Sequence, residues 1–350
     1  MAIKINSLQG VSTMSANGTN RYSRVNPLAR NRNPLWNFVH IFQGTNTGYA
    51  SGAPPATNVI DKFPFATDAN ATDVGNLSVV RSNASGQSSD ASGYTSGGYF
   101  PPVSFSNVID KFPFASDGNA TDVGDLTVAR RNVTGQSSSV SGYASGGYSA
   151  TPPVPSRFRT EIDKFPFATN SNATNIGALT VGRYSSAGQS SDVSGYASGG
   201  QRAPQTTPPI PQFFVNIIDK FPFATDAGAT DVGDLVILNC FVSGQSSTVS
   251  GYTSGGSGRF PATPATPSTL KNNIEKFPFA TDANATDIAD LTLARSAVAG
   301  QTSTVSGYTS GGFASPTTNV IDKFPFASDA NATDVGDLSS VRQSIAGIQD

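Results

Sequence analysis

Histidine, cysteine and tryptophan are almost absent from this sequence. Its 350 residues contain one of each, and the histidine is His40 and the cysteine Cys240. We interpret His40 as a packing residue or part of an extended segment, which leaves no base for a Ser-His-Asp triad, a Cys-His pair or a multi-histidine metal site. The single cysteine excludes an intramolecular disulfide, and its neighbours indicate a small buried residue. We therefore expect a protein that is not an enzyme, with no catalytic residue and no cofactor.

Phosphate-binding glycine loops and long apolar runs are also missing. No Gly-x-Gly-x-x-Gly or P-loop motif occurs. No stretch approaches the roughly 18 apolar residues that a membrane helix needs. The first residues lack the apolar core of a secretory signal. These absences predict a chain without a nucleotide cradle and without membrane insertion.

Charged residues are scarce and unevenly placed. They make up 13% of the chain, about half the usual share. Residues 1–60 contain five basic residues and no aspartate or glutamate, whereas residues 61–350 contain 17 basic and 24 acidic residues. Five positive charges spread over the leader are too dilute for a strong phosphate-binding stripe. We therefore expect no nucleic-acid binding, and we expect the basic leader to dock on an acidic protein surface.

One phrase, Phe-Pro-Phe, organises the rest of the chain. It occurs six times, beginning at Phe63, Phe112, Phe165, Phe221, Phe277 and Phe324. A second phrase, Ser-Gly-Tyr-(Ala/Thr)-Ser-Gly-Gly, follows the first five copies, and its tyrosine always comes 31 residues after the phenylalanine, as Tyr94 follows Phe63. All length variation falls between each tyrosine and the next Phe-Pro-Phe. Repeats of this size predict a solenoid or a propeller with variable loops on one side.

Four short strands are predicted in each repeat from alternation and turn residues. In the second copy they cover residues 107–114, 122–128, 135–138 and 141–145. Pro113 cannot donate a ladder hydrogen bond, so we place it at a strand end or bulge, and we expect a bulge at Gly124. No helix signal occurs in the repeat. Four strands per repeat predict one blade of a propeller.

The repeat resembles a kelch repeat. The likeness covers residues 46–350 and rests on the paired glycines of Gly-Tyr-x-Ser-Gly-Gly, the aromatic third strand Ile-Asp-Lys-Phe-x-Phe, the polar turn and the closing arginine. Two features depart from kelch repeats: valine, as at Val74 and Val123, replaces the usual tryptophan of the fourth strand, and the first strand is Gln-Ser-Ser rather than apolar. The resemblance implies an all-β, six-bladed kelch-like β-propeller over residues 46–350, preceded by an extended anchoring arm at 1–45.

Closure of the ring is expected at the C-terminus. Gly347 lies at the same offset from its Phe-Pro-Phe as the glycine of Gly-Gln-Ser-Ser in the other copies, and the first copy lacks that segment. We therefore expect residues 344–350 to supply the missing innermost strand of the first blade, which leaves no open edge. Residues 38–43 are the alternative strand.

The wording Phe-Pro-Phe-Ala-Thr-Asp also resembles kelch-like repeats in structural proteins of tailed phages, notably those that infect cyanobacteria. This resemblance implies a non-enzymatic virion protein, such as a tail or capsid accessory with a part in host attachment. Its partners would be other virion proteins, through the arm, and a host-surface glycan or receptor, through the loops. The alternative is a free carbohydrate-binding lectin or adhesin.

Aromatic and arginine side chains collect in the variable connections, where recognition residues are common on a rigid scaffold. The alternative is that these aromatics fold back over their own blades. The candidate binding residues are Tyr99, Phe100, Phe105, Arg157, Phe158, Arg159, Phe213, Phe214, Arg259, Phe260 and Phe313. In the arm, the candidate anchoring residues are Arg21, Arg24, Arg30, Arg32 and Trp36.

The turn Asp68-x-Asn70-x-Thr72-Asp73 and its copies place oxygens at alternate positions, as calcium loops do. They lack the bidentate glutamate and central glycine of an EF-hand, and an Asx turn explains the pattern more simply. We therefore predict no metal site, with calcium as the alternative.

Paired residues elsewhere in the repeat are expected to be structural. The aspartates of the Asp-Lys pairs should bind the closing arginines of neighbouring strands, and the phenylalanines and tyrosines should fill the gaps between blades.

Overall fold

The computed structural model describes residues 12–14, 20–22, 43–53, 57–100, 104–150, 157–203, 205–206, 209–210, 214–259 and 269–350. The chain divides into two compact units, Met1–His40 and Ile41–Asp350. In the first unit, β1 (Ser12–Met14) pairs antiparallel with β2 (Asn20–Tyr22). Within the described ranges every regular element is a strand, and no helix is present that could cross a membrane.

The second unit contains six four-stranded antiparallel sheets within its described residues. We number the sheets 1 to 6 along the chain and give the strands of each sheet in hydrogen-bonding order, from the first strand to the fourth. In sheet 1 the first strand comes from the C-terminus. Sheet 1 is β35 (Ala346–Gln349), β3 (Thr47–Ala53), β4 (Thr57–Pro64) and β5 (Thr72–Asn76). Sheet 2 is β6 (Ser85–Ser88), β7 (Ser92–Ser96), β10 (Val108–Pro113) and β11 (Thr121–Asp125). Sheet 3 is β12 (Thr134–Ser137), β13 (Ser141–Ser145), β14 (Glu161–Pro166) and β15 (Thr174–Ala178).

The other three sheets repeat this order. Sheet 4 is β17 (Ala187–Ser190), β18 (Ser194–Ser198), β22 (Ile217–Pro222) and β23 (Thr230–Asp234). Sheet 5 is β25 (Ser243–Ser246), β26 (Ser250–Ser254), β29 (Asn273–Pro278) and β30 (Thr286–Asp290). Sheet 6 is β31 (Ala299–Thr302), β32 (Ser306–Ser310), β33 (Val320–Pro325) and β34 (Thr333–Asp337).

Smaller sheets form in the variable connections. β8 (Tyr99–Phe100) pairs with β9 (Ser104–Phe105), and β16 (Arg183–Tyr184) pairs with β19 (Gln201–Arg202). β20 (Gln205–Thr206) pairs with β21 (Pro209–Ile210). β24 (Leu238–Cys240), β27 (Ser257–Arg259) and β28 (Thr269–Leu270) form a three-stranded sheet.

The four strands of the second repeat and its bulge follow the sequence prediction closely, with one correction. Pro113 is the last residue of β10, where its missing N–H costs no ladder bond. The register shifts opposite Gly124, which is the expected bulge. The fourth strand ends at Asp125 rather than at residue 128, because Thr127 turns toward sheet 3 and donates its N–H to Asp163 Oδ2 at 2.8 Å.

The C-terminal strand completes sheet 1, as predicted. β35 pairs antiparallel with β3, with Ala50 opposite Gly347. The alternative partner, residues 38–43, lies outside the described residues except for Gln43, and β35 occupies the edge of β3 that it would have taken. The first strands contact one another in the order β6, β12, β17, β25, β31 and β35, and β35 contacts β6. The chain end therefore joins a closed circuit of contacts.

A circuit of glycines explains how closely the first strands approach. A Cβ atom added to Gly86 would lie 2.0 Å from the carbonyl oxygen of Gly347, and one added to Gly135 would lie 2.2 Å from that of Gly86. The same relation links each glycine to the preceding strand around the whole circuit: Gly86, Gly135, Gly188, Gly244, Gly300 and Gly347. No side chain fits at these six positions without movement of the backbone.

A second circuit consists of backbone hydrogen bonds. The residue three places before each of these glycines has a positive φ between 52° and 57°. Its N–H donates to the carbonyl of its equivalent in the preceding sheet, over 2.7 to 3.1 Å. The six residues are Asn83, Asn132, Ser185, Phe241, Ala297 and Ser344, and Asn83 donates to Ser344. The left-handed backbone at these positions thus aims each amide at its neighbour.

Aromatic side chains fill the space between sheets, as predicted. Tyr94 of sheet 2 stacks on Phe167 of sheet 3 with ring centroids 4.8 Å apart, and Phe165 lies 5.6 Å from the same tyrosine. The equivalent tyrosines of the other sheets are Tyr49, Tyr143, Tyr196, Tyr252 and Tyr308, and each stacks on the next sheet in the same way. Each fully buried phenylalanine contributes about 1.5–3 kcal/mol to stability.

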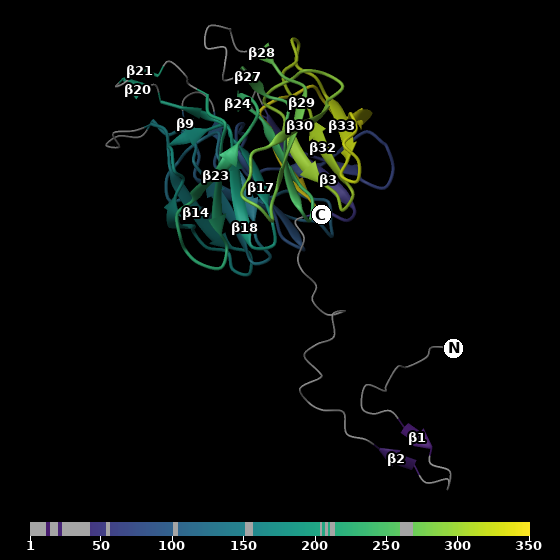
Figure 1. The fold of residues 1–350 in the computed structure, drawn as a ribbon. Helices are drawn as coiled ribbons and strands as arrows, with labels where there is room; N and C mark the ends of the chain where they lie inside the picture. The colour runs from purple at the N-terminus through teal and green to yellow at the C-terminus, as the bar shows by residue number, and fades with distance from the viewer. Residues whose placement is uncertain are drawn as a thin grey trace. The chain divides into compact units, whose positions relative to one another are not determined.

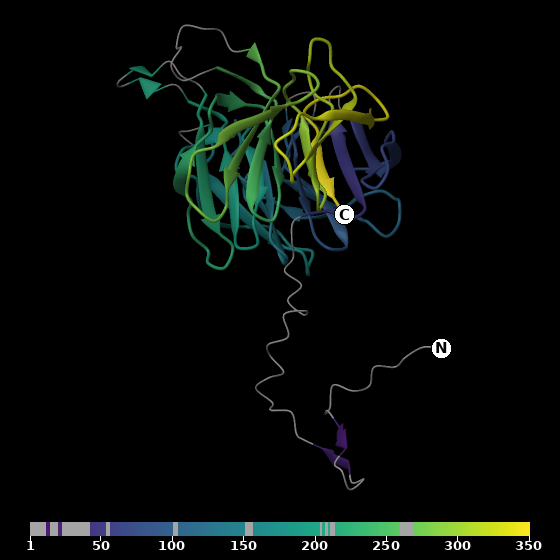
Figure 2. The same cartoon turned by 45° about the vertical axis from the view of Figure 1, so that its right-hand side comes forward.

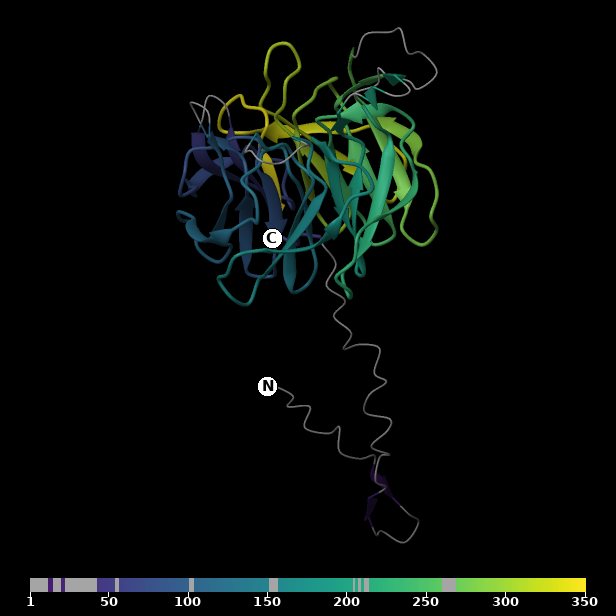
Figure 3. The same cartoon turned by 90° about the vertical axis from the view of Figure 1, so that its left-hand side faces the viewer.

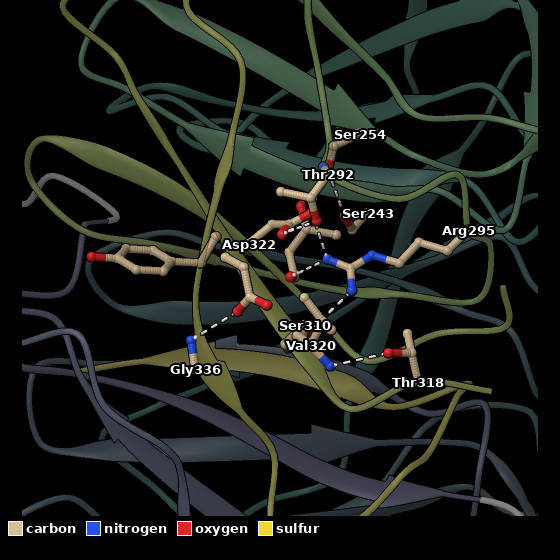
Figure 4. A network of polar contacts seen from close by, with 12 residues as sticks. Ser243, Ser254, Thr292, Arg295, Ser310, Thr318, Val320, Asp322 and Gly336 are labelled. Carbon is tan, nitrogen blue, oxygen red and sulfur yellow. Dashed lines mark hydrogen bonds and ion pairs between the residues drawn. The ribbon is translucent and has the colours of Figure 1, made fainter.

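Buried ion pairs join neighbouring sheets at five positions. Arg183 Nη1 lies 3.0 Å from Asp219 Oδ2, with both side chains fully buried. The other pairs are Arg81–Asp110, Arg130–Asp163, Arg295–Asp322 and Arg342–Asp61. Figure 4 shows the copy at Arg295 and Asp322, where Arg295 also donates to the carbonyl of Val320. The predicted pairing of the aspartates with the closing arginines is therefore confirmed for these five.

The sixth position differs. Asn239 stands where the other repeats have the arginine, and Glu275 stands where they have the aspartate. Asn239 Nδ2 donates to the carbonyl of Gly255 at 2.8 Å, and Glu275 Oε2 accepts from the N–H of Val236 at 2.7 Å. Among the described residues no cation pairs with Glu275, which is buried. Sheet 5 thus contains a buried carboxyl group that has no counter-charge within the described part of the chain.

The six sheets share one orientation. Because successive strands are antiparallel, connections from second to third strands and from fourth strands to the next sheet lie at one end, which we call the variable end. The small sheets of β9, β20, β21, β24, β27 and β28 lie there (Figures 1 and 2). The other end, the turn end, holds the two remaining turns of each sheet, and Figure 3 shows these ends from a third side. The chain enters at the turn end, where the N–H of Gly44 donates to the carbonyl of Thr302 at 2.8 Å.

Candidate binding rim

Aromatic side chains of sheets 2, 3 and 4 meet at the variable end. We call this group the rim and define it as Tyr99, Phe105, Arg131, Tyr148, Phe158 and Tyr184. Tyr99 and Phe105 face each other across the β8–β9 pair, with centroids 6.2 Å apart. Tyr148 follows the paired glycines of sheet 3 and forms backbone bridges to both Arg131 and Phe158. The backbone therefore holds two neighbouring connections together.

Arg131 is the centre of the rim. Its guanidinium carbon lies 5.4 Å from the ring centroid of Tyr99, 5.7 Å from that of Phe105 and 5.4 Å from that of Tyr148. Contacts of this kind attract a cation to the negative face of the ring. Arg131 Nε is buried without a hydrogen-bond partner among the described residues. Three rings thus hold a guanidinium for which the described residues supply no carboxylate partner.

The rim continues from ring to ring toward the axis of the circuit. The ring centroid of Phe105 lies 6.0 Å from that of Tyr148, and the Tyr148 centroid lies 5.7 Å from that of Tyr184. Tyr184 in turn lies 6.3 Å from Phe241. Burial is the main cause that raises the pKa of Tyr184, so its hydroxyl stays neutral and donates to Gln201 Oε1 at 2.7 Å. These contacts form one half-buried aromatic surface across three sheets.

Two hollows lie along the first strands on either side of the glycine circuit. The larger, of about 130 Å³, is lined at the variable end by the six residues with positive φ, Phe241 among them. The smaller, of about 60 Å³, is lined at the turn end by residues such as Ser88 and Ser137. The six glycines line both hollows. Phe241 therefore connects the rim to the larger hollow.

The structure brings together part of the predicted binding set. Tyr99, Phe105 and Phe158 belong to the rim, and the exposed Arg157 reaches it by donating to the Tyr148 hydroxyl at 3.4 Å. Phe100 is the second residue of β8. Phe214 bridges to Gln201 of β19 in the connection between the second and third strands of sheet 4. Phe313, in the equivalent connection of sheet 6, bridges to Ser296 and Thr317 and has 40% of its surface exposed.

The remaining predicted residues do not join this group. Arg159 is buried and forms an ion pair with Glu161, so its charge is already balanced. Phe213 and Phe260 lie outside the described residues, as do Arg24, Arg30, Arg32 and Trp36. Arg259 and Arg21 lie on β27 and β2, where only the backbone is described.

Sequence reasoning missed four residues: Arg131, Tyr148, Tyr184 and Phe241. A usable signal was present in the repeats. The position after the closing arginine reads Ser82, Arg131, Tyr184, Cys240, Ser296 and Gln343 across the six copies. Variation at one position of a regular repeat indicates a surface where the copies differ. The sequence did not show that this position lies beside the variable connection.

The Asp-x-Asn-x-Thr turns use their oxygens within the protein. Asp73 Oδ1 accepts the N–H of Gly75 at 3.1 Å, so this Asx contact lies at the bulge within β5 rather than in the turn before the strand, where it was predicted. Asn119 Oδ1 accepts the N–H of Asn76 in the neighbouring sheet at 3.0 Å. In the described part of the chain, no group of three or more histidine, cysteine, aspartate or glutamate side chains is placed to hold a metal ion. These turns therefore act as links between sheets.

Cys240 is a buried core residue, as its neighbours in the sequence indicate. Burial raises the pKa of its thiol, which keeps it protonated and unreactive.

No protein-family model matches this chain, and a search of curated proteins finds no significant similarity.

Proposed function

We propose that the six sheets are the blades of a six-bladed, kelch-like β-propeller. The circuit of first strands, the circuit of six glycines and the circuit of six backbone hydrogen bonds all support this architecture, because each returns to its starting sheet. The pairing of β35 with β3 supports closure by the C-terminal strand. A closed ring protects every first strand from pairing with another molecule.

We further propose that the protein is a non-enzymatic structural and binding component of a phage virion. The carrying observation is the separation of two features: the chain enters at the turn end, and the rim lies at the variable end. A point of chain entry at one end of the second unit and a recognition surface at its other end suit a protein that is fixed to a particle and presents its loops outward. In this proposal, residues 1–42 bind other virion proteins.

The alternative is a free carbohydrate-binding lectin or adhesin. The rim favours it equally, because aromatic and arginine side chains on rigid loops are common in binding sites of both kinds. Only the role of the N-terminal segment separates the two proposals.

Particle incorporation tests the virion proposal. Phage particles are assembled in the presence of either the full chain or a variant lacking residues 1–42. The particles are then purified, and an immunoblot measures how much of each chain they contain. We expect the truncated chain to keep its melting temperature and to be lost from particles. A full-length variant with Arg131→Gln is the control, and we expect normal incorporation. Incorporation of the truncated chain at the full level, or absence of the full chain from particles, would refute the proposal and leave the lectin.

A further inference from the structure

Charge is segregated between the two ends of the second unit. The connections between second and third strands, residues 54–56, 97–107, 146–160, 199–216, 255–272 and 311–319, contain five basic residues and no aspartate or glutamate. All 24 acidic residues of the chain lie elsewhere. These connections therefore carry only positive charge in a protein whose net charge is −2.

At the turn end, basic and acidic residues occur together. Its turns between third and fourth strands carry an aspartate in five of the six repeats, and each of these pairs with a lysine of the preceding sheet, as Asp117 pairs with Lys62 at 3.0 Å. The exception is Lys111, because Asn170 stands at the corresponding position. Positive charge at this end is mostly balanced by the protein itself.

Positive charge in the rim is not balanced in this way. Arg131 is held by three aromatic rings, and the exposed Arg157 donates a hydrogen bond to the Tyr148 hydroxyl at 3.4 Å. Arg159 provides the contrast within the same connection, since Glu161 pairs with it. A guanidinium fixed in a half-buried position without a carboxylate is prepared to accept an external anion.

We propose that the rim binds an acidic polysaccharide, with a carboxylate or sulfate group at Arg131 and Arg157 and with sugar hydroxyls at the neighbouring tyrosines. This inference takes the rim as the binding surface of the proposed function and adds the chemical class of its ligand. Charge complementarity carries it: Arg131 and Arg157 both lie against rim tyrosines, and the connections between second and third strands contain no aspartate or glutamate.

Nucleic acid fits the same charge less well. Single-stranded nucleic acid binds by stacking its bases on open aromatic faces. In the rim the Arg131 guanidinium already covers faces of Tyr99, Phe105 and Tyr148. The remaining cations are spread over three connections and do not form a continuous track for a phosphate backbone.

Binding of heparin to the purified full chain tests the proposal, with neutral dextran and a short single-stranded DNA as comparison ligands. We expect heparin to bind, with an affinity that falls as salt concentration rises, and dextran not to bind. Arg131→Gln and Arg157→Gln should each weaken heparin binding roughly threefold to tenfold, which is the typical net share of one hydrogen bond. Arg157 is exposed, so its substitution leaves the fold intact if Arg131→Gln disturbs packing.

Lys111→Gln is the matched control. It removes one positive charge that forms no ion pair among the described residues and that also lies over an aromatic ring, 5.7 Å from the Tyr94 centroid, but at the turn end. We expect it to leave heparin binding unchanged. The proposal is overturned if heparin does not bind, if Lys111→Gln weakens binding as much as the rim variants, or if DNA binds more tightly than heparin. Heparin binding by a chain that is absent from particles would refute the virion proposal alone, and incorporation without heparin binding would refute this one alone.

Discussion

Glu275 makes the stability of this protein depend on pH in a way that can be isolated. In five repeats a buried aspartate at this position binds an arginine, but Glu275 has Asn239 in place of that arginine. Burial is the main cause that raises the pKa of Glu275 from 4.5 to about 7; the N–H of Val236 lowers it, and the carboxylate of Asp287, opposite Glu275 in β30, raises it further.

The sign of the effect follows from this direction. A folded-state pKa above the unfolded value means that the folded protein holds the proton more tightly. The stabilising contribution of the protonated carboxyl is therefore complete below about pH 4.5, decreases as the pH rises, and is lost above about pH 7. This interval, at about 1.4 kcal/mol per pH unit, corresponds to about 3 kcal/mol of the free energy of unfolding.

Glu275→Gln removes the titration while keeping an oxygen that can accept from Val236. The assay is chemical denaturation of both proteins at a series of pH values from 4.5 to 8. All other groups titrate in both proteins, so the difference between the two free energies of unfolding isolates Glu275. We expect the variant to gain about 3 kcal/mol relative to the natural protein between pH 4.5 and pH 8. A difference that stays constant across this range would refute the reasoning.

Three further predictions concern stability. Gly188→Ala should lower the free energy of unfolding by at least about 2 kcal/mol, because its Cβ would lie 2.0 Å from a backbone oxygen of the neighbouring sheet; Gly118→Ala, which has open space around it, is the control and should change it by less than about 0.5 kcal/mol. Arg183→Met should cost about 3–5 kcal/mol in denaturant unfolding, since it leaves Asp219 buried without a counter-charge, and a loss below about 1 kcal/mol would contradict this. Removal of residues 346–350 should lower the melting temperature and cause self-association on size-exclusion chromatography, because it exposes the edge of β3, whereas an unchanged monomer would argue against closure.

Much of the fold could be predicted from the sequence because the repeat is regular. The strand at 141–145, the position of Pro113 at a strand end and the completion of sheet 1 by the C-terminus all follow from alternation, turn residues and one constant offset. The fourth strand was predicted too long, since no local signal shows that Thr127 binds Asp163 of another sheet.

The candidate site was predicted only in part, because contacts between different repeats leave no signal in the local sequence. Composition alone identified the variable connections as rich in aromatic and arginine side chains, and Tyr99, Phe105 and Phe158 do meet there. Arg131 belongs to a different connection, and only the bridge between its backbone and that of Tyr148 places it among those rings.

The sequence by itself determined the repeat, its strands and the closing role of the last residues, because these depend on local periodicity and on spacing along the chain. Tertiary structure alone decided which side chains of different repeats touch, since those contacts join residues that are far apart in the chain. It gave Arg131 three aromatic neighbours, paired Arg159 with Glu161, and buried Glu275 where none of the described residues supplies a cation. The physical reason is that burial and neighbouring charge, unlike strand propensity, are properties of a position in space.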